Sequence, residues 1–434
     1  MLRGRFRLVP AIVAAAIVVA AAPAAWAQSD PADPFFDDTV VHDIKLSINV
    51  KDWESLKVHY LENTVYPCYF EWRDQIVRNI GIRSRGTGSR SGVKPGLRVD
   101  FDYYSTDQKF LGLKSVILRN NTQDASNMRE RLSMLFFRRM GMYAEREAHA
   151  RLYINSDYAG VYTIVESIDK TWLKKMFGEN EGHLYEYKFD NAASTPYDFG
   201  YIGSDPTLYA PLPFKPQTLE SDPQGQVLER MFWTANQAGD AVWRSAMQEF
   251  LDLKSFIRHV AIEVFLADQD GLVGDYGPNN FYLYRFDKKN LFKFLPWDKS
   301  NALWDAPSPN YSIFRNIDEG TESHRNKLVV RALKDPELRE LFLDTLLECA
   351  NRAAELGNTG TQANLNDPAQ LGWLEAEIAR EYEQIRLPVA FDTVKISSNG
   401  EFEKSVADIK NFARQRSEAV RAQVAADRAR RGSR

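Results

Sequence analysis

Three oxygen-bearing side chains lie in residues 264–304, the segment richest in groups that could do chemistry. Asp270, Asn280 and Asp298 offer two carboxylates and one carboxamide, a set that suits Mg²⁺ or Mn²⁺ far better than Zn²⁺. Phosphoryl transfer needs a metal ion that bridges phosphate oxygens and an aspartate that orients the incoming hydroxyl and accepts its proton. The order Asp, Asn, Asp along the chain therefore favours metal-assisted phosphoryl transfer.

Two other interpretations of this segment stay open. Asp, Asn and Gly are common in loops for conformational reasons alone, so these could be turn residues. A calcium-binding loop is the second alternative, because residues 268–271 resemble the start of one. The EF-hand pattern fails, however, at Leu272 and Asn279, which stand where an oxygen ligand and the closing Glu are expected. The sequence contains no P-loop, zinc-protease or nucleophile-elbow motif.

A basic, glycine-rich segment at residues 83–98 is the second candidate. Glycines let the backbone approach phosphates closely, and cationic side chains neutralise them. Arg85, Lys94 and Arg98 are the candidate phosphate-binding residues, and Arg98 is favoured because a predicted strand holds its side chain firmly. The alternative is a solvated, mobile loop.

Glu166 is a lone acid at the end of an apolar run, residues 164–168. A kinase needs an acid that pairs with the nucleotide-binding cation, and Glu166 is the candidate for that role. An ordinary surface glutamate is the alternative.

A helix and a hairpin must position the three oxygen-bearing side chains. The apolar spacing of Phe256, Val260 and Val264 predicts a helix over residues 253–267, which ends just before Asp270. Residues 280–286 and 291–297 read as the two strands of a hairpin. Because a hairpin brings its two ends together, Asn280 and Asp298 are expected side by side, within reach of Asp270.

The remaining pattern predicts an α+β fold with two lobes, β-rich in the first half of the chain and helix-rich in the second. We expect a flexible start at 28–39, a β-rich lobe at 40–190, a loop or insertion between the lobes at 191–225, a mainly helical lobe with the hairpin at 226–425, and a frayed basic tail at 426–434. A further helix is predicted at 127–140, with Asn127 and Glu130 forming a capping box.

Composition narrows the class of protein. The 434 residues are 44% hydrophobic and 12% aromatic, which is ample for the core of two lobes. A net charge of −4 gives no electrostatic footprint for nucleic acid. Cys68 and Cys349 could pair in an oxidising compartment, but two cysteines form neither a disulfide scaffold nor a zinc motif.

Residues 1–27 have the pattern of a secretory signal peptide. Three arginines precede an Ala- and Val-rich run, and Ala25 and Ala27 complete a small-x-small cleavage site. A retained membrane anchor is the alternative, but the short, weakly hydrophobic run favours cleavage. We therefore expect a secreted or periplasmic protein without a stable membrane span.

Four stretches, in one order, are similar to those of the CotH family of spore-coat-type, secretory kinase-like proteins. The resemblance covers roughly residues 40–306. The stretches are the Arg-Gly-Thr-Gly-Ser-Arg segment 85–90 with the basic strand 97–101, residues 118–121 with the helix start 124–131, the tyrosine-rich hairpin 153–169, and the catalytic half formed by Asp270, residues 280–284 and residues 296–298.

This resemblance implies an atypical protein-kinase-like fold, and an enzyme that binds ATP with Mg²⁺ or Mn²⁺ and phosphorylates Ser or Thr of a protein substrate. By position, Asp270 matches the catalytic acid/base, Asn280 and Asp298 match the metal ligands, and Glu166 matches the ion-pair acid.

Two positions depart from the family pattern. The family Asn falls on Thr87, and a family Lys falls on Arg98. A planar guanidinium does not replace an ammonium, so either Lys94 substitutes or activity is impaired. A catalytically inactive protein that acts in surface or coat assembly, or in adhesion, therefore remains an alternative.

Overall fold

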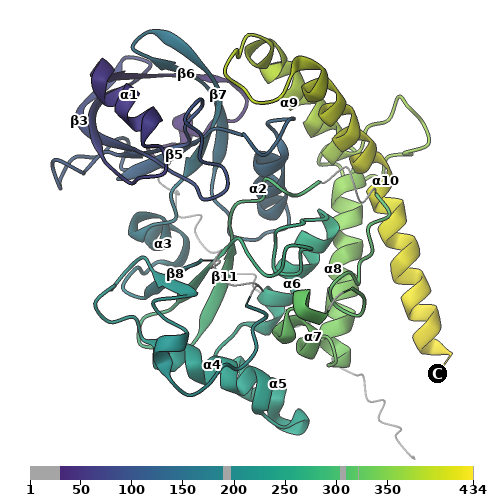
Figure 1. Ribbon diagram of the computed structural model, residues 1–434. Helices are drawn as coiled ribbons and strands as arrows, with labels where there is room; N and C mark the ends of the chain where they lie inside the picture. The colour runs from purple at the N-terminus through teal and green to yellow at the C-terminus, as the bar shows by residue number, and fades with distance from the viewer. Residues whose placement is uncertain (1–29, 189–196, 304–308, 321, 434) are drawn as a thin grey trace, which may run out of the picture.

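The computed structural model describes residues 30–188, 197–303, 309–320 and 322–433 (Figure 1). The predicted signal peptide, residues 1–27, lies outside the described residues. Within them, no helix is both long enough and apolar enough to cross a membrane.

The first lobe is a closed barrel of seven strands, visible at the upper left of Figure 1. β1 and β6 pair in parallel and the other neighbours are antiparallel. Strict alternation in β1 buries every second side chain, as expected for strands around a filled barrel. In spatial order the strands are β1 (His42–Ile48), β2 (Tyr66–Trp72), β3 (Gln75–Ser84), β4 (Leu97–Asp100), β5 (Ser115–Arg119), β7 (Asp157–Glu166) and β6 (Glu147–Ile154). Helix α1 (Val50–Val58) follows β1.

Helix α2 (Arg129–Arg139) connects β5 to β6 and lies between the barrel and the helical lobe (Figure 1). The predicted capping box is wrong. Met128 is the N-cap and makes no side-chain cap, while the Asp124 carboxylate accepts a hydrogen bond from the Arg129 backbone N–H at 2.8 Å. Glu130 is consequently available for another contact, and its side chain is buried.

The second lobe contains a four-stranded antiparallel sheet in the order β11-β10-β8-β9. Its strands are β8 (His183–Tyr187), β9 (Phe214–Pro216), β10 (Phe281–Arg285) and β11 (Phe292–Pro296). The predicted boundary between lobes therefore lies too late: β8 belongs to the second lobe, and the predicted insertion at 191–225 supplies β9. The short helix α3 (Lys170–Phe177) marks the passage from the barrel to this sheet.

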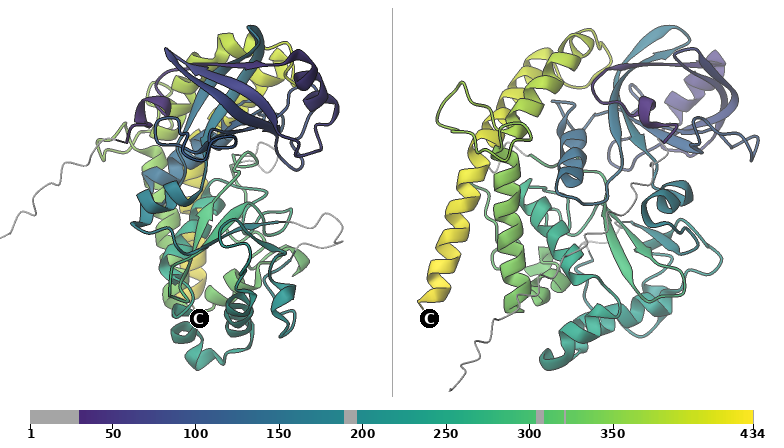
Figure 2. Two further views of the ribbon diagram at one scale, coloured as in Figure 1. Left: turned by 90° about the vertical axis from the view of Figure 1, so that its left-hand side faces the viewer. Right: turned by 180° about the vertical axis from the view of Figure 1, so that it is seen from behind.

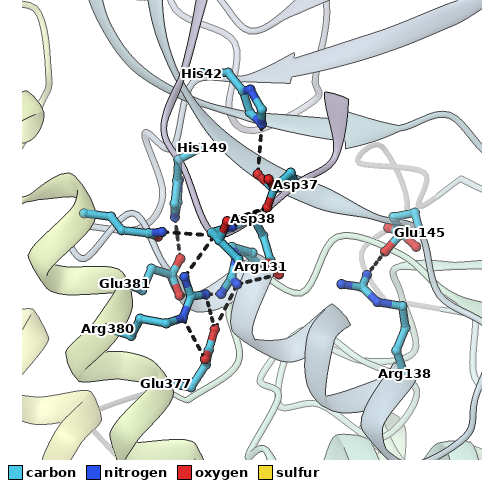
Figure 3. Close-up of polar contacts among 12 residues, drawn as sticks. Asp37, Asp38, His42, Arg131, Arg138, Glu145, His149, Glu377, Arg380 and Glu381 are labelled. Atoms are coloured by element: carbon cyan, nitrogen blue, oxygen red, sulfur yellow. Dashed lines mark hydrogen bonds and ion pairs between the residues drawn. The ribbon is translucent and has the colours of Figure 1, made fainter. Parts of the chain in front are cut away.

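Helices complete the second lobe and connect it to the barrel. They are α4 (Gly225–Gln237), α5 (Asp240–Gln248), α6 (Leu253–Phe265), α7 (Lys327–Ala332), α8 (Pro336–Ala354), α9 (Trp373–Ala390) and α10 (Asn399–Gly432). Helix α9 packs on β7 of the barrel, and α10 runs beside α8 in both views of Figure 2. Arg131 of α2 pairs with Glu377 and Glu381 of α9 (Figure 3), which fixes α2 against the C-terminal helices.

Both ends of the described chain differ from the predicted flexible termini. Phe35 is fully buried against Phe70 and Trp72 of the barrel, so this end of the described chain is anchored to the barrel core. Residues 426–432 continue α10, because Arg428 and Arg431 pair with Glu340 of α8.

The predicted α+β architecture, with a β-rich first half and a helix-rich second half, is confirmed. Cys68 and Cys349 are each buried and free. Cys68 lies in the barrel core and Cys349 in the core of the helical lobe, so they form no disulfide.

Candidate functional site at the junction of the lobes

The β10–β11 hairpin brings Asn280 and Asp298 to the same end of the sheet. Phe281 pairs with Pro296, so Asn280 and Asp298 lie just beyond the last paired residues. Both adopt left-handed backbone conformations, with φ of 55° at Asn280 and 50° at Asp298. Non-glycine residues in this conformation are uncommon and cluster at functional sites.

Asp270 follows α6 and contacts the same hairpin end. Its carboxylate accepts hydrogen bonds from Asn280 Nδ2 at 2.7 Å and from Asn279 Nδ2 at 3.0 Å. Burial raises the pKa of Asp270 to about 7; the hydrogen bond from Asn279 opposes this rise, and the neighbouring charges of Asp268 and Asp298 add to it. The structure therefore brings the three predicted oxygen-bearing side chains together.

Asp298 is held as a carboxylate. Ser300 donates its hydroxyl to Oδ1 at 3.0 Å, and Arg119 pairs with Oδ2 at 2.7 Å. Burial by itself would raise the pKa of Asp298, but the Arg119 charge and hydrogen bond lower it below its ordinary value. The side chain keeps 22% of its surface exposed, so a ligand can reach it.

Arg119 and Glu130 belong to this site, although the sequence reasoning gave neither a site role. Arg119 ends β5, and its guanidinium pairs with Glu130 of α2 at 2.7 Å as well as with Asp298. Protein kinases use a strand cation paired to a helix acid, next to the metal-binding Asp. The only sequence signal was indirect, because both residues lie in stretches that resemble the CotH family.

A buried ion network stands behind Asp270 and Asn280. Lys299 pairs with Glu263 of α6 at 2.5 Å and with Asp268 at 3.0 Å, and it donates to the Asn280 backbone oxygen at 3.1 Å. The turn approaches Glu263 closely at Gly271, where a Cβ would lie 2.7 Å from the Glu263 carboxylate. This network fixes the loop that carries Asp270 to the hairpin that carries Asn280.

Arg85 reaches the site from the glycine-rich loop between β3 and β4. Its guanidinium carbon lies 5.1 Å from the centroid of the Trp297 ring, next to Asp298 in sequence. The loop is anchored, because Arg90 donates to the backbone oxygens of Gly86, Tyr60 and Glu62. Arg85 therefore lies beside Trp297, at the hairpin end that carries Asp298.

The structure does not bring Lys94 or Glu166 to the three oxygen-bearing side chains. The Lys94 ammonium is buried in an ion pair with Asp392 at 2.7 Å and also donates to a backbone oxygen of β7. Glu166 is engaged by Arg146 at 2.7 Å and by Lys175. Both side chains contribute to the packing of the barrel against its neighbours.

Arg98 lies in the wall of a cavity of about 680 Å³ between the lobes. Its Nε pairs with Asp100 at 2.6 Å. Residues of β4, β5, α3 and the second sheet line the cavity, and Ile117, Tyr282 and Trp297 give it apolar walls. This volume is within the range of about 300–1,000 Å³ that small-molecule sites occupy. Trp297, which lines the cavity, immediately precedes Asp298 in the sequence.

Comparisons with known proteins extend over most of the chain. A family model described as "CotH kinase protein" matches residues 82–420. Inner spore coat protein H of Bacillus subtilis (strain 168) is 23% identical over 380 residues, which are 86% of this chain and 95% of that protein. The crystal structure of the Helicobacter pylori proinflammatory kinase CtkA matches 76% of this chain and 94% of its own, with a TM-score of 0.28 and 8% identity, a likeness too weak to support an argument.

Proposed function

The chain belongs to the CotH kinase protein family, and from that membership we propose that it is an exported phosphotransferase that moves the γ-phosphoryl group of ATP to a Ser or Thr hydroxyl of a protein. One observation carries the proposal. Arg119 joins Asp298 to Glu130 at the end of the hairpin where Asn280 holds Asp270. These contacts support the proposal, because they gather one cation, two paired acids and the carboxylate of Asp270 at the junction of the two lobes.

Asp298 and Asn280 would hold Mg²⁺ or Mn²⁺. The donor set fits, since Asp298 stays ionised beside Arg119 and Asn280 uses its amide nitrogen on Asp270, so its carbonyl oxygen can serve as a ligand. Hard divalent cations prefer such oxygen donors. When bound, the ion neutralises charge on the phosphate oxygens during transfer.

Asp270 would position the acceptor hydroxyl and take its proton. The hydrogen bonds from Asn279 and Asn280 fix the orientation of its carboxylate. A catalytic base works best when its pKa lies near the working pH, and burial raises the pKa of Asp270 to about 7.

The nucleotide base would occupy the cavity between the lobes, against Tyr282 and Trp297. Its phosphates would then extend past Trp297 toward Asp298, where Arg85 and Arg119 lie near the same ring at 5.1 and 5.6 Å from its centroid. Arg119 would then supply the phosphate-binding charge, and neither the family Lys that falls on Arg98 nor a substitution by Lys94 would be needed for it.

An extracytoplasmic acceptor fits two observations. The sequence begins with the pattern of a secretory leader, and a relative that covers most of the chain is named as an inner spore coat protein. A coat or envelope protein with accessible Ser or Thr residues is the proposed substrate.

A catalytically inactive assembly protein is the second candidate. The relative's name describes a coat component rather than an enzyme, and Arg98 stands where the family pattern has a Lys. Such a protein could bind nucleotide in the cavity or not, but it would transfer no phosphate.

Phosphate transfer from γ-labelled ATP tests these proposals. The full chain is incubated with Mn²⁺ or Mg²⁺ and casein as a general acceptor, and compared with Asp270→Asn and Asp298→Asn. Asp275→Asn is the matched control, because Asp275 lies in the same loop but pairs with Arg315. Loss of labelling in both site variants, with the control active, supports the enzyme. Nucleotide binding without transfer by the natural chain supports the assembly protein.

A further inference from the structure

Three glutamates form a separate acidic cluster behind the Arg119–Asp298 pair. Glu130 comes from α2, Glu145 precedes β6 and Glu147 opens it. One carboxylate oxygen from each lies within 4.8 Å of the others. We propose that Glu130, Glu145 and Glu147 bind a second divalent cation, with Mn²⁺ or Mg²⁺ as the fitting ion, independently of nucleotide.

All three side chains are removed from water. Glu130 keeps 4% of its surface exposed, and Glu145 and Glu147 keep none. Charged carboxylates buried to this degree are normally paired with a cation or bound to a metal, because an isolated buried charge is very unfavourable.

Glu145 and Glu147 lack partners among the described residues. Neither carboxylate accepts a hydrogen bond from another described residue, and Glu130 alone of the three glutamates has an ion pair in the described part of the chain, with Arg119. Arg138, which Figure 3 shows beside Glu145, donates to the backbone oxygen of Glu145 instead of its carboxylate. Glu145 and Glu147 are thus two buried carboxylates in one cluster that receive no hydrogen bond from a neighbouring residue. A bound cation would explain this arrangement.

Three arginines lie near the cluster, and none of them forms an ion pair with Glu145 or Glu147 among the described residues; the Arg138 guanidinium lies near both glutamates without such a pair. Arg119 divides its guanidinium between Glu130 and Asp298. Arg131 pairs with Asp38, Glu377 and Glu381 (Figure 3). The cluster therefore keeps an excess of negative charge, and three carboxylates on two separate elements can surround a hard cation.

Protonation is the competing explanation for the cluster. Burial raises the pKa of Glu145 and of Glu147 to about 8, so protons could neutralise them where no cation does. The two explanations differ in outcome, because a cation must displace these protons to bind, so a cluster held by protons alone should bind a metal ion weakly at neutral pH and more tightly as the pH rises above about 8.

A cation in this cluster would act on the proposed phosphate site through Glu130. The cation would share the Glu130 carboxylate with Arg119 and so weaken the ion pair between Glu130 and Arg119. The Arg119 guanidinium could then interact more strongly with Asp298 and with a bound phosphate. This consequence rests on the proposed function, whereas cation binding itself does not.

Mn²⁺ binding to the full chain without nucleotide tests the site. Free Mn²⁺ is followed by electron paramagnetic resonance, and the melting temperature is measured with and without the ion. The variants are Glu145→Gln/Glu147→Gln, Glu147→Gln alone in case the double variant folds poorly, and Asp298→Asn as the matched variant at the proposed catalytic metal site.

The natural chain and Asp298→Asn should bind Mn²⁺ and gain melting temperature with it. The glutamine variants should lose at least about tenfold in affinity, and their metal-free melting temperature should stay equal or rise, because buried charge is removed. The proposal is overturned if the natural chain binds no Mn²⁺ without nucleotide, if the glutamine variants bind it as well as the natural chain, or if Asp298→Asn alone abolishes binding.

Discussion

Arg119 contacts both acids that frame the proposed phosphate site. Its guanidinium lies 2.7 Å from Glu130 and 2.7 Å from Asp298, and only 6% of the side chain is exposed. A guanidinium stays charged at any working pH and can pair with two carboxylates in one plane. Arg119 therefore fixes α2 of the first lobe to the hairpin of the second.

The variant Arg119→Lys tests whether the site needs only the positive charge of Arg119 or also the shape of its guanidinium. The ammonium of Arg119→Lys keeps the positive charge but cannot span both acids, so Asp298 loses its fixed position. We expect kcat/KM for ATP to fall by about 10²-fold, as for other misplaced groups, with the protein still folded. Steady-state kinetics beside a melting curve measure this; unchanged kinetics would remove Arg119 from the site.

Asp270→Asn should affect the chemical step alone. The carboxamide is isosteric but cannot accept a proton, so kcat should fall by about 10²–10⁴-fold. The affinity for ATP, measured by calorimetry, should change little, because Asp270 touches Asn279 and Asn280 but does not line the cavity. A fall in affinity as large as the fall in kcat would argue against a role as base.

At the scale of elements, α6 and the hairpin are joined through a buried charge network. Lys299 is fully buried between Glu263 and Asp268. Lys299→Met should lower the free energy of unfolding by about 3–5 kcal/mol, because two carboxylates lose their buried counter-charge. Urea denaturation measures this. Adding Glu263→Gln to Lys299→Met should recover part of the loss; a purely additive double variant would contradict the network.

The same network predicts acid sensitivity. Burial alone would raise the pKa of Glu263, but the charges of Lys299 and His259 lower it to about 2. The unfolded value is about 4.3, so the ionised carboxylate stabilises the fold above that pH and the contribution is lost as the pH falls toward 2. Glu263→Gln should therefore flatten the decline of stability between about pH 4.3 and 2.

Chemical denaturation at several acidic pH values checks this expectation. Glu348→Gln is the control, because Glu348 pairs with Arg258 at a partly exposed position. Equal slopes for Glu263→Gln and the natural chain would show that the network does not govern acid stability.

The elements around the site were predictable to different degrees. The hairpin followed from alternating apolar residues and a polar turn, and it correctly placed Asn280 beside Asp298. The predicted N-terminal cap of α2 was wrong, because Glu130 matched the capping-box pattern although Asp124 is the residue that accepts a hydrogen bond from the first turn. Helix caps depend on local spacing, whereas the contact of Glu130 with Arg119 joins separate elements and leaves no periodic signal.

At the scale of the whole molecule, the C-terminal helices connect both lobes. Lys94 pairs with Asp392, just beyond α9, and only 1% of either side chain is exposed. Arg416 of α10 donates to the backbone oxygens of Val264 and Phe265 at the end of α6, the helix that leads to Asp270. Packing of α9 and α10 therefore determines how the two halves of the site meet.

Lys94→Met should lower the free energy of unfolding by about 3–5 kcal/mol, since Asp392 is left as a buried, unpaired charge. KM for ATP should stay the same, because the ammonium faces Asp392 and not the cavity. Thermal denaturation and kinetics on one preparation measure both quantities. A raised KM with normal stability would return Lys94 to the phosphate-binding role that its place in the sequence suggested.

Long-range pairing explains why the remaining site residues escaped sequence reasoning. The family resemblance is confirmed, and Asp270, Asn280 and Asp298 lie together as spacing predicted. Lys94 and Glu166 looked equally suitable by residue type, but their partners, Asp392 and Arg146, lie far from them in the sequence. The sequence around a charged residue does not predict which residue of opposite charge will form an ion pair with it.

A crystal structure of the chain with Mn²⁺ and a non-hydrolysable ATP analogue tests the central claim most directly. Anomalous scattering should place a Mn²⁺ ion on the carboxylate of Asp298 and the carbonyl oxygen of Asn280, with the γ-phosphate near Asp270 and the base against Tyr282 and Trp297. Nucleotide bound away from the junction of the lobes, or a nucleotide-linked metal ion without Asp298 among its ligands, would contradict the account.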